Sequence, residues 1–295
     1  MPELPDITIY RERLEAYVLG HAPLRVRMLN PFVLRSVAVP PQSLEGVTIV
    51  GVRTIGKRIV LMFDGDRYVV IHLMIAGRLR WRPPGKKLPG KLALASFEFE
   101  QGTLFLSEAG SKRRASVFVV HGADSLAQFD RGGIDPLTSS LVEFTHALHR
   151  ENHTLKRSLT DPRLFSGIGN AYSDEILHAA RLSPMQLSGK MPDIDIARLR
   201  DATLGTLTQW TARLRAETGD AFPEIVTAFH DAMAVHGRFG KPCPVCAAPV
   251  QRIRYADNET NYCARCQTGG RILADRALSR LLKSDFPRTL EELEG

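Results

Sequence analysis

The stretch CPVCAAPVQRIRYADNETNYCARC, residues 243–266, contains all four cysteines of the chain and determines how its C-terminal part folds. Two C-x2-C pairs, Cys243 with Cys246 and Cys263 with Cys266, are separated by 16 residues. This spacing is typical of a zinc site with four thiolate ligands, and the residues between the pairs can form a β-hairpin. Four thiolates leave no open coordination position, so the expected Zn²⁺, one per chain, is structural and does not activate water.

A pair of disulfides is the alternative use of these cysteines. The N-terminus carries acidic residues where a signal peptide has a positively charged start and an apolar run. No apolar stretch approaches the roughly 20 residues that span a bilayer. We therefore expect a cytoplasmic, bacterial-type, nucleoid-associated protein, and zinc is favoured because a reducing cytosol disfavours disulfides.

The composition indicates a globular protein with a basic surface. The chain has 295 residues, of which 44% are hydrophobic and 24% charged, enough for two or three domains. Its formal net charge of +7 suits a polyanionic partner such as nucleic acid. Charge alone does not establish that partner, because many basic proteins bind no nucleic acid.

Upstream of the cysteines the chain shows two different patterns. Residues 4–19 have apolar side chains at helical spacing, and short runs rich in Val, Ile, Leu and Phe then alternate with turn residues up to about 121. These runs predict an antiparallel sandwich or barrel. They are residues 25–29, 47–55, 58–64, 68–75, 95–100, 102–108 and 115–120.

A linker-like stretch, FDRGGIDPLTSS (129–140), separates this part from helical patterns that extend to about 235. The predicted domains are residues 1–130, 131–235, 236–267 and an extension over 268–295. The fold class is α+β: an N-terminal helix with an antiparallel β-sandwich, a helical domain and a zinc hairpin. In the extension, Leu273, Ala277, Leu281 and Leu282 predict a helix packed on the zinc module; DNA contact or a protein partner are the alternatives.

Two short motifs contain groups that could bind a ligand or react. GIGN (167–170) opens a predicted helix, and backbone N–H groups at such a start can bind a phosphate together with the Asn170 amide. MPELPDITIY (1–10) makes Pro2 a secondary amine if Met1 is removed, with Glu3 beside it. An α-amine has a reference pKa near 8, so roughly a tenth is neutral at pH 7, and a nearby helix N-terminus increases that share.

Taken together, these motifs resemble the Fpg/Nei family, formamidopyrimidine-DNA glycosylase and endonuclease VIII. The resemblance rests on PELPD (2–6), IGKRIVLMF (55–63), HLMIAGRL (72–79), GIGNAYSDEIL (167–177) and VHGRFGKPCPVC (235–246), in the family's order, and covers residues 1 to about 267. It implies a β-sandwich behind an N-terminal helix, a helix–two-turn–helix domain and a zinc finger. It also implies a bifunctional DNA glycosylase/AP lyase acting on double-stranded DNA with oxidised bases or abasic sites, as a monomer.

The resemblance assigns roles to individual residues. Pro2 is similar to the family's nucleophile, Glu3 to its acid/base and Lys57 to its lysine that contacts phosphate and donates a proton during β-elimination. Asn170 is similar to the asparagine that binds the phosphates beside the lesion, and His72 lies in the matching HLMIAG motif. Glu175 matches a family acid whose role is open, and Asp6 stands where the family usually has glutamate.

Departures from the family pattern affect the substrate. Fpg-type enzymes fill the gap left by the extruded base with methionine, arginine and phenylalanine; here Ile75 or Met74, Arg113 and Ala115 occupy those positions. This weaker wedge indicates a different opposite-base preference or a substrate that opens more easily.

In the zinc hairpin Asn258 replaces an arginine that clamps phosphate, so β-elimination is favoured over δ-elimination. Arg252 and Arg254 are candidate substitutes for that arginine. Two other functions remain open: a lyase for abasic or single-stranded sites, and a damaged-DNA-binding protein without turnover.

Overall fold

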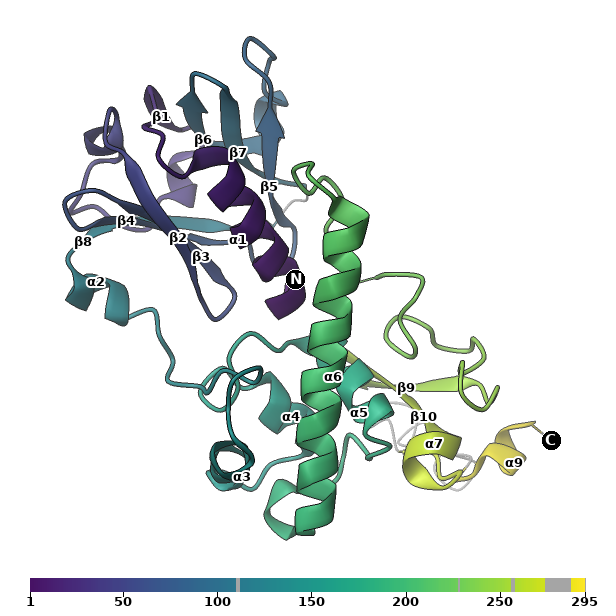
Figure 1. The fold of residues 1–295 in the computed structure, drawn as a ribbon. Coiled ribbons are helices and arrows are strands. Elements are labelled where there is room, and N and C mark those ends of the chain that lie inside the picture. The colour runs from purple at the N-terminus through teal and green to yellow at the C-terminus, as the bar shows by residue number, and fades with distance from the viewer. Residues whose placement is uncertain (110–111, 228, 256–257, 274–287, 295) are drawn as a thin grey trace. The chain divides into compact units, whose positions relative to one another are not determined.

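The computed structural model describes residues 1–109, 112–227, 229–255, 258–273 and 288–294, drawn as a ribbon in Figure 1. The chain divides into two compact units. The first consists of Met1–Arg131 with Trp210–Ala228, and the second of Gly132–Gln209 with Phe229–Gly295. Among the helices described, none has the length and apolar character needed to cross a membrane.

The first unit is a β-sandwich of two four-stranded antiparallel sheets, with strand orders β1-β6-β7-β5 and β2-β3-β4-β8 (Figure 1). The strands are β1 Arg25–Met28, β2 Ile49–Ile55, β3 Arg58–Phe63, β4 Arg67–His72, β5 Gly77–Arg82, β6 Ala93–Phe99, β7 Gly102–Glu108 and β8 Ser116–His121. Side chains from both sheets form one buried core, which includes Leu61, Phe97 and Leu106. The predicted antiparallel sandwich is confirmed.

Helix α1, Leu4–Val18, packs against β2 and β3. Its buried face contains Ile7, Tyr10, Leu14 and Val18, the residues whose helical spacing predicts this element. The short elements of this unit are α2 Ala123–Ala127 and the 3-10 turns η1 Pro31–Val33, η2 Pro41–Leu44 and η3 Gly90–Leu92.

Two sequence expectations are wrong in detail. Strand β5 is absent from the expected runs because arginines alternate with its apolar residues, whereas the structure buries Leu79 on one face. The run at 68–75 ends as a strand at His72, since Met74 has a positive φ of 52° within the turn that leads into β5.

The second unit carries α3 Leu141–His149, α4 Leu155–Thr160, η4 Ser188–Lys190, α5 Asn170–Ala179 and α6 Asp193–Thr218. Helix α6 continues into the first unit, where Arg215 Nη2 lies 2.7 Å from Glu12 Oε1 of α1. In the described parts of 219–235 there is no helix, which corrects the expectation that helices extend to about 235. Phe222 instead packs in the sandwich core of the first unit.

The zinc module follows, with β9 Val250–Tyr255, β10 Asn258–Cys263 and α7 Ala264–Thr268, and the last helix described is α9 Leu290–Glu294. Leu290 and Leu273 belong to the module's own apolar cluster, and the backbone N–H of Ile272 donates to Arg288 O at 2.8 Å. Residues 288–294 therefore pack on the zinc module. The helix predicted around Ala277, Leu281 and Leu282 lies outside the described residues.

Candidate active site and metal centre

The N-terminus is buried at the start of helix α1. Pro2 is buried and Glu3 is 2% exposed. Asp6, in the first turn, accepts a hydrogen bond from the Glu3 backbone N–H at 2.9 Å. Such a bond satisfies a donor that the helix itself cannot, and it fixes the backbone that carries Pro2 and Glu3. Asp6 thus has a structural role.

Burial also sets the electrostatics of this region. It lowers the pKa of the Met1 α-amine, Glu3 and Asp6 oppose that shift, and Arg78 and Lys57 reinforce it. Burial raises the pKa of Asp6 to about 7; the hydrogen bond from the Glu3 backbone opposes this shift, and the Glu3 charge adds to it. Lys57 is half-buried in the β2–β3 turn. A lowered pKa increases the neutral, nucleophilic share of an α-amine at this position, and the Glu3 carboxyl group lies next to it.

His72 lies at the end of β4, opposite Arg58 of β3 and Ser116 of β8. Burial lowers its pKa to about 4, and the positive charges of Arg58 and Lys57 contribute. The imidazole is therefore neutral at pH 7 and can offer a hydrogen bond, but no charge, to a phosphate.

In the second unit Asn170 is the first residue of α5, after the turn at Gly167, which has a φ of +80°. The Asn170 amide donates to Glu259 O of β10 at 2.9 Å. Lys156 of α4 donates to Asn170 O and to Asp174 Oδ1, each at 2.6 Å. These bonds fix the start of the helix, a position that favours anions, and the Lys156 ammonium beside it is paired with Asp174.

Two further side chains of this unit were not assigned roles from the sequence. Glu175, 5% exposed, accepts backbone N–H bonds from Ala234, Val235 and His236 at 2.6, 2.9 and 2.9 Å. His236 Nδ1 lies 2.8 Å from Asp174 Oδ2. Glu175 therefore has an anchoring role, since it holds the segment that enters the zinc module; only its position in a family motif indicated it beforehand.

The four cysteines meet at one point in the zinc module. Their sulfurs lie within 4.8 Å of one another, with Cys243–Cys266 at 3.9 Å and Cys246–Cys263 at 3.4 Å. A tetrahedral Zn²⁺ with Zn–S bonds of about 2.3 Å needs sulfurs about 3.8 Å apart. The site fits a structural zinc ion, and no thiolate is left over for catalysis.

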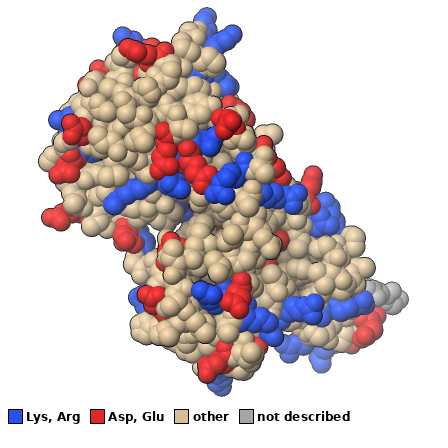
Figure 2. Space-filling model, viewed as in Figure 1, with Lys and Arg blue, Asp and Glu red and all other residues tan. Residues whose placement is uncertain are grey.

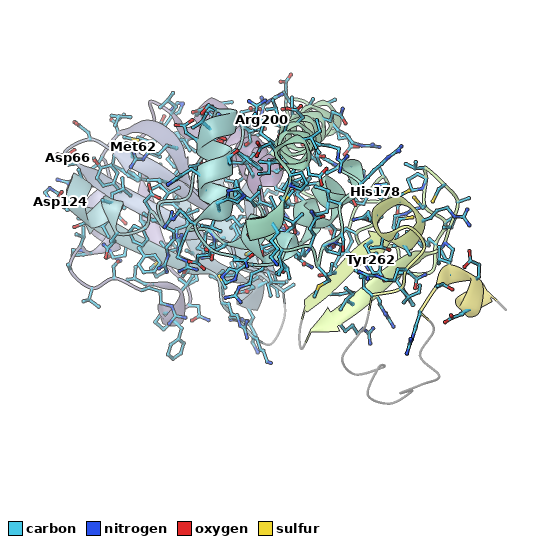
Figure 3. The ribbon with its side chains drawn as sticks, turned by 90° about the horizontal axis from the view of Figure 1, so that it is seen from below. Met62, Asp66, Asp124, His178, Arg200 and Tyr262 are labelled. Carbon is cyan, nitrogen blue, oxygen red and sulfur yellow. The ribbon has the colours of Figure 1, made fainter. Side chains whose placement is uncertain are left out.

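A buried histidine supports this metal centre from outside. His178 of α5, labelled in Figure 3, places Nε2 3.3 Å from Cys243 Sγ. With its proton on Nε2 it donates to the thiolate, which fixes the ligand and moderates its charge. No sequence pattern indicated this contact, because 65 residues separate the two positions.

The hairpin residues predicted to contact phosphate are placed as follows. Asn258 pairs with Tyr255 through the β9–β10 ladder, and its side chain lies outside the described part of the structure. Arg252 stacks on Phe239, with the guanidinium carbon 4.0 Å from the ring centroid. Arg254, 59% exposed at its side chain, lies 3.4 Å from Glu259. Both arginines therefore have protein partners in this structure.

The wedge positions differ in their exposure. Ile75 is 61% exposed and Arg113 is exposed, whereas Ala115 is 3% exposed and belongs to the sandwich core. Glu108, 1% exposed, accepts backbone N–H bonds from Arg114 and Ala115, which fixes the end of this loop. Position 115 therefore offers no side chain to DNA.

Three family models match the chain in order. They are the formamidopyrimidine-DNA glycosylase N-terminal domain over residues 1–114, the formamidopyrimidine-DNA glycosylase H2TH domain over 133–216, and the zinc finger found in FPG and IleRS over 240–269. The chain belongs to the formamidopyrimidine-DNA glycosylase family. The predicted family, fold class and structural zinc finger are confirmed.

Relatives of this family come from several bacteria. A formamidopyrimidine-DNA glycosylase of Thermus thermophilus is 31% identical over 282 residues, which cover 92% of this chain and all of the relative. A formamidopyrimidine-DNA glycosylase-like protein of Mycobacterium tuberculosis, itself described as uncharacterized, is 38% identical over 151 residues, 51% of this chain and 94% of the relative.

Solved structures of the glycosylase family share the fold. The crystal structure of MutM (Fpg) from Thermus thermophilus has 30% identity and a TM-score of 0.76, and covers 90% of this chain and 98% of that one. The structure of Lactococcus lactis Fpg in complex with abasic-site DNA has a TM-score of 0.77 at 22% identity, and covers 90% of this chain and 99% of that one. This similarity shows a shared fold.

Proposed function

We propose that the chain is a bifunctional DNA glycosylase/AP lyase that removes oxidised bases from double-stranded DNA and cuts the strand, acting as a monomer on the bacterial nucleoid. One observation carries the proposal: Pro2 and Glu3 lie together, buried, at the start of α1, and burial and neighbouring cations lower the pKa of the adjoining Met1 α-amine. A surface proline and a surface acid would have neither property.

The reaction begins with removal of Met1, which frees the secondary amine of Pro2. The target nucleotide leaves the duplex, because its sugar carbon is inaccessible within the stack. The amine lone pair attacks C1′, the bond from C1′ to the damaged base breaks, and the base leaves with that electron pair and takes up a proton from solvent. The Pro2 nitrogen loses its proton to water. Glu3 then donates a proton to the ring oxygen as the bond from C1′ to that oxygen breaks, and an iminium forms between Pro2 and C1′.

Strand cleavage follows from the iminium. It acidifies the C2′ proton; loss of this proton breaks the C3′–O bond, and water then hydrolyses the iminium to free Pro2. We assign to Lys57 the phosphate contact and proton donation in this step. Asn170, beside the Lys156 ammonium, binds phosphates near the lesion, and His72 offers a neutral hydrogen-bonding group.

The basic surface suits this assignment. Lys and Arg occur in patches among acidic side chains on the face shown in Figure 2, and the chain carries a net charge of +7. In this proposal residues 1–130 carry the chemistry, and residues 131–235 and 236–267 bind DNA. Asn258 brings no charge to the hairpin, so we expect cleavage to stop after β-elimination.

Borohydride trapping tests the proposal. Purified protein is reacted with duplexes that carry 8-oxoguanine, an oxidised pyrimidine or an abasic site, while intact mass establishes whether Met1 is absent. A covalent adduct on a lesion duplex from protein without Met1 supports the glycosylase/lyase and identifies its lesion class. An adduct only on the abasic site supports the lyase alternative, and no adduct despite a free Pro2 supports a DNA-binding protein without turnover.

Matched variants sharpen the assignment. Pro2→Gly retains a free amine in a more flexible backbone, and Pro5→Ala changes the proline in the first turn of the helix that follows, α1. Pro2→Gly should lose most of the trapped adduct while still binding the lesion duplex, and Pro5→Ala should keep it. Lys57→Ala should slow strand cleavage, with Lys86→Ala, an exposed lysine of the same unit, as the control. Equal cleavage by Pro2→Gly and wild-type protein would refute the assignment of the nucleophile.

A further inference from the structure

Phe32 is an exposed aromatic side chain of the first unit. It is 78% exposed, although its neighbour Val33 is 3% exposed. Its backbone lies in turn η1, where Pro31 restricts the chain and Asn30 Oδ1 accepts the Phe32 N–H at 3.0 Å. Asn30 N–H in turn donates to Leu94 O of β6 at 3.0 Å. The exposure of Phe32 is therefore built into a fixed turn.

The turn lies beside the loop that carries Arg113. A small pocket is lined by Phe32 together with Asn30, Val33, Leu94, Arg113 and Ala115. The backbone beyond the turn pairs with β8, since Leu34 bridges to Val117 and Arg35 N–H donates to Val117 O at 2.8 Å. Phe32 and Arg113 thus come from segments about 80 residues apart, and the β-sandwich fixes them next to each other.

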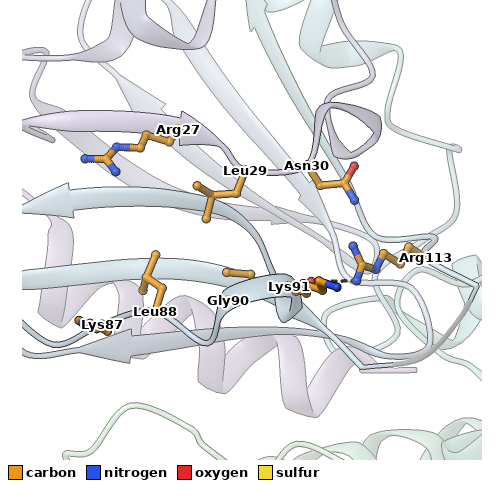
Figure 4. Close-up of a pocket in the computed structure, with 9 residues that line it drawn as sticks. Arg27, Leu29, Asn30, Lys87, Leu88, Gly90, Lys91 and Arg113 are labelled. Atoms are coloured by element: carbon orange, nitrogen blue, oxygen red, sulfur yellow. Dashed lines mark hydrogen bonds between the residues drawn. The ribbon is translucent and has the colours of Figure 1, made fainter.

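A basic pocket of about 800 Å³ adjoins this pair, and Figure 4 shows it. Asn30 and Arg113 line both pockets, and Arg113 Nη2 donates to Lys91 O at 2.8 Å. The cationic residues lining it are Arg27, Lys87, Lys91 and Arg113, and none of its described lining residues is acidic. An exposed aromatic ring beside clustered cations is the combination that surfaces use to stack bases and neutralise phosphates.

Position 115 has no room for an aromatic side chain. Ala115 is 3% exposed, and Gly77 packs so closely on it that a Cβ added at Gly77 would lie 3.0 Å from the Ala115 Cβ. The turn before Gly77 carries Ile75, which is 61% exposed. Exposed Ile75, Arg113 and Phe32 therefore belong to three segments that all border the buried Ala115.

We propose that Phe32, beside Arg113, is the aromatic side chain that enters the base stack of duplex DNA where a nucleotide has left it. This inference rests on the proposed function, because the gap that Phe32 fills is the one that the extruded nucleotide leaves. An apolar side chain between base steps keeps a kinked duplex open, and its contacts with the neighbouring bases replace part of the stacking free energy that is lost when the base leaves. Phe32 thus takes over, from a different segment, the task that position 115 cannot perform.

The test compares Phe32→Ala with Phe32→Trp and with Val37→Ala, a fully exposed apolar side chain five residues further along. Each protein is trapped on an abasic-site duplex and on the same strand without its complement. Binding to the duplex is followed by fluorescence of 2-aminopurine placed beside the abasic site. A single strand has no stack to hold open, so a wedge contributes only on the duplex.

We expect Phe32→Ala to lose about tenfold to a hundredfold in affinity and trapping on the duplex, and to trap the single strand as wild-type protein does. The 2-aminopurine fluorescence should rise less when Phe32→Ala binds than when wild-type protein binds. Phe32→Trp should recover most of the lost duplex affinity and trapping. Val37→Ala should match wild-type protein. Equal behaviour of Phe32→Ala and wild-type protein on the duplex, or equal losses on both substrates, overturns the inference.

The two proposals fail in different ways. If wild-type protein traps neither substrate, the proposed lyase chemistry is wrong, while a selective loss of duplex binding in Phe32→Ala still supports the wedge. If wild-type protein traps both and Phe32→Ala is indistinguishable from it, the chemistry stands and the wedge is refuted.

Discussion

Replacing Asp6 with asparagine removes a carboxyl group that the first unit buries at the start of helix α1. Asp6 is 6% exposed, and burial raises its pKa to about 7 from an ordinary value of 3.8. Asparagine has nearly the same shape, and its carbonyl oxygen can still accept the Glu3 N–H that Asp6 Oδ2 accepts at 2.9 Å. The substitution therefore changes the titration and leaves the helix cap in place.

The number of protons bound by the folded and the unfolded state determines how the free energy of unfolding changes with pH. Between pH 3.8 and about 7 the folded protein keeps a proton on Asp6 that the unfolded chain has lost. The folded state binds more protons there, so the free energy of unfolding decreases as the pH rises through this window. The gap between the two pKa values corresponds to about 4 kcal/mol once the pH exceeds 7.

Thermal unfolding of the two proteins from pH 4 to pH 8 measures this effect. Relative to wild-type protein, Asp6→Asn should gain stability as the pH rises, by about 4 kcal/mol or about 10 °C in the melting temperature of the first unit. Asp124→Asn removes an exposed carboxylate of the same unit and should show no such trend. A constant difference between Asp6→Asn and wild-type protein across this range would refute the reasoning.

Three further outcomes are expected. His178→Phe removes the N–H beside Cys243, so zinc should bind about 10- to 100-fold more weakly. Competition with a chromophoric chelator measures this affinity. His149→Phe, at an exposed position of α3 in the same unit, provides the control. Ala115→Phe should lower the free energy of unfolding by about 1–3 kcal/mol in urea, because the ring must enter the packed core; improved DNA binding with unchanged stability would contradict its burial. In NMR spectra the ring-proton shifts of His72 should follow a titration with a midpoint near pH 4, because burial disfavours the charged imidazole. Protonation of His72 should therefore lower the free energy of unfolding as the pH falls from about 6.5 toward 4. A midpoint near 6.5 would contradict its burial.

Local patterns in the sequence predict the elements whose structure depends mainly on local residues. The spacing of Ile7, Tyr10, Leu14 and Val18 fixes α1 and its buried face, and the two C-x2-C pairs specify the metal centre. Each of these signals is complete within about 25 residues. Most strands of the sandwich are found for the same reason, since alternation and turn residues are local features.

Other features depend on partners far away in the sequence. The apolar residues around Phe222 resemble helix, yet Phe222 lies 5% exposed among Tyr10, Tyr17 and Trp81, so long-range packing decides its conformation. Likewise, the neighbourhood of Phe32 and Arg113 follows from strand pairing over about 80 residues. The sequence motif identified Arg113 but not Phe32, because it contains no information on which distant residue lies next to Arg113.

Three buried carboxylates show how the fold holds the segments that carry its proposed chemistry. Asp6 accepts from the backbone of Glu3, Glu108 from Arg114 and Ala115, and Glu175 from residues 234–236. Each of these segments lies at the end of a helix or strand or in a loop, where the regular ladder of backbone bonds leaves N–H groups without partners. A carboxylate has two oxygens with several acceptor positions, so one side chain can fix two or three adjacent donors.

Burying such an acid raises its pKa, as at Asp6 and Glu175, and so costs stability near neutral pH. In return it fixes the backbone of the proposed nucleophile Pro2, the segment of Arg114 and Ala115, and the entry to the zinc module. The proposed reaction needs such groups to be held in place, because a misplacement of about 1 Å can cost about a hundredfold in rate. Glu108→Gln should therefore leave the sandwich folded and single-strand trapping unchanged, but weaken duplex trapping in the same direction as Phe32→Ala, because glutamine can replace only part of the acceptor capacity that holds Arg114 and Ala115.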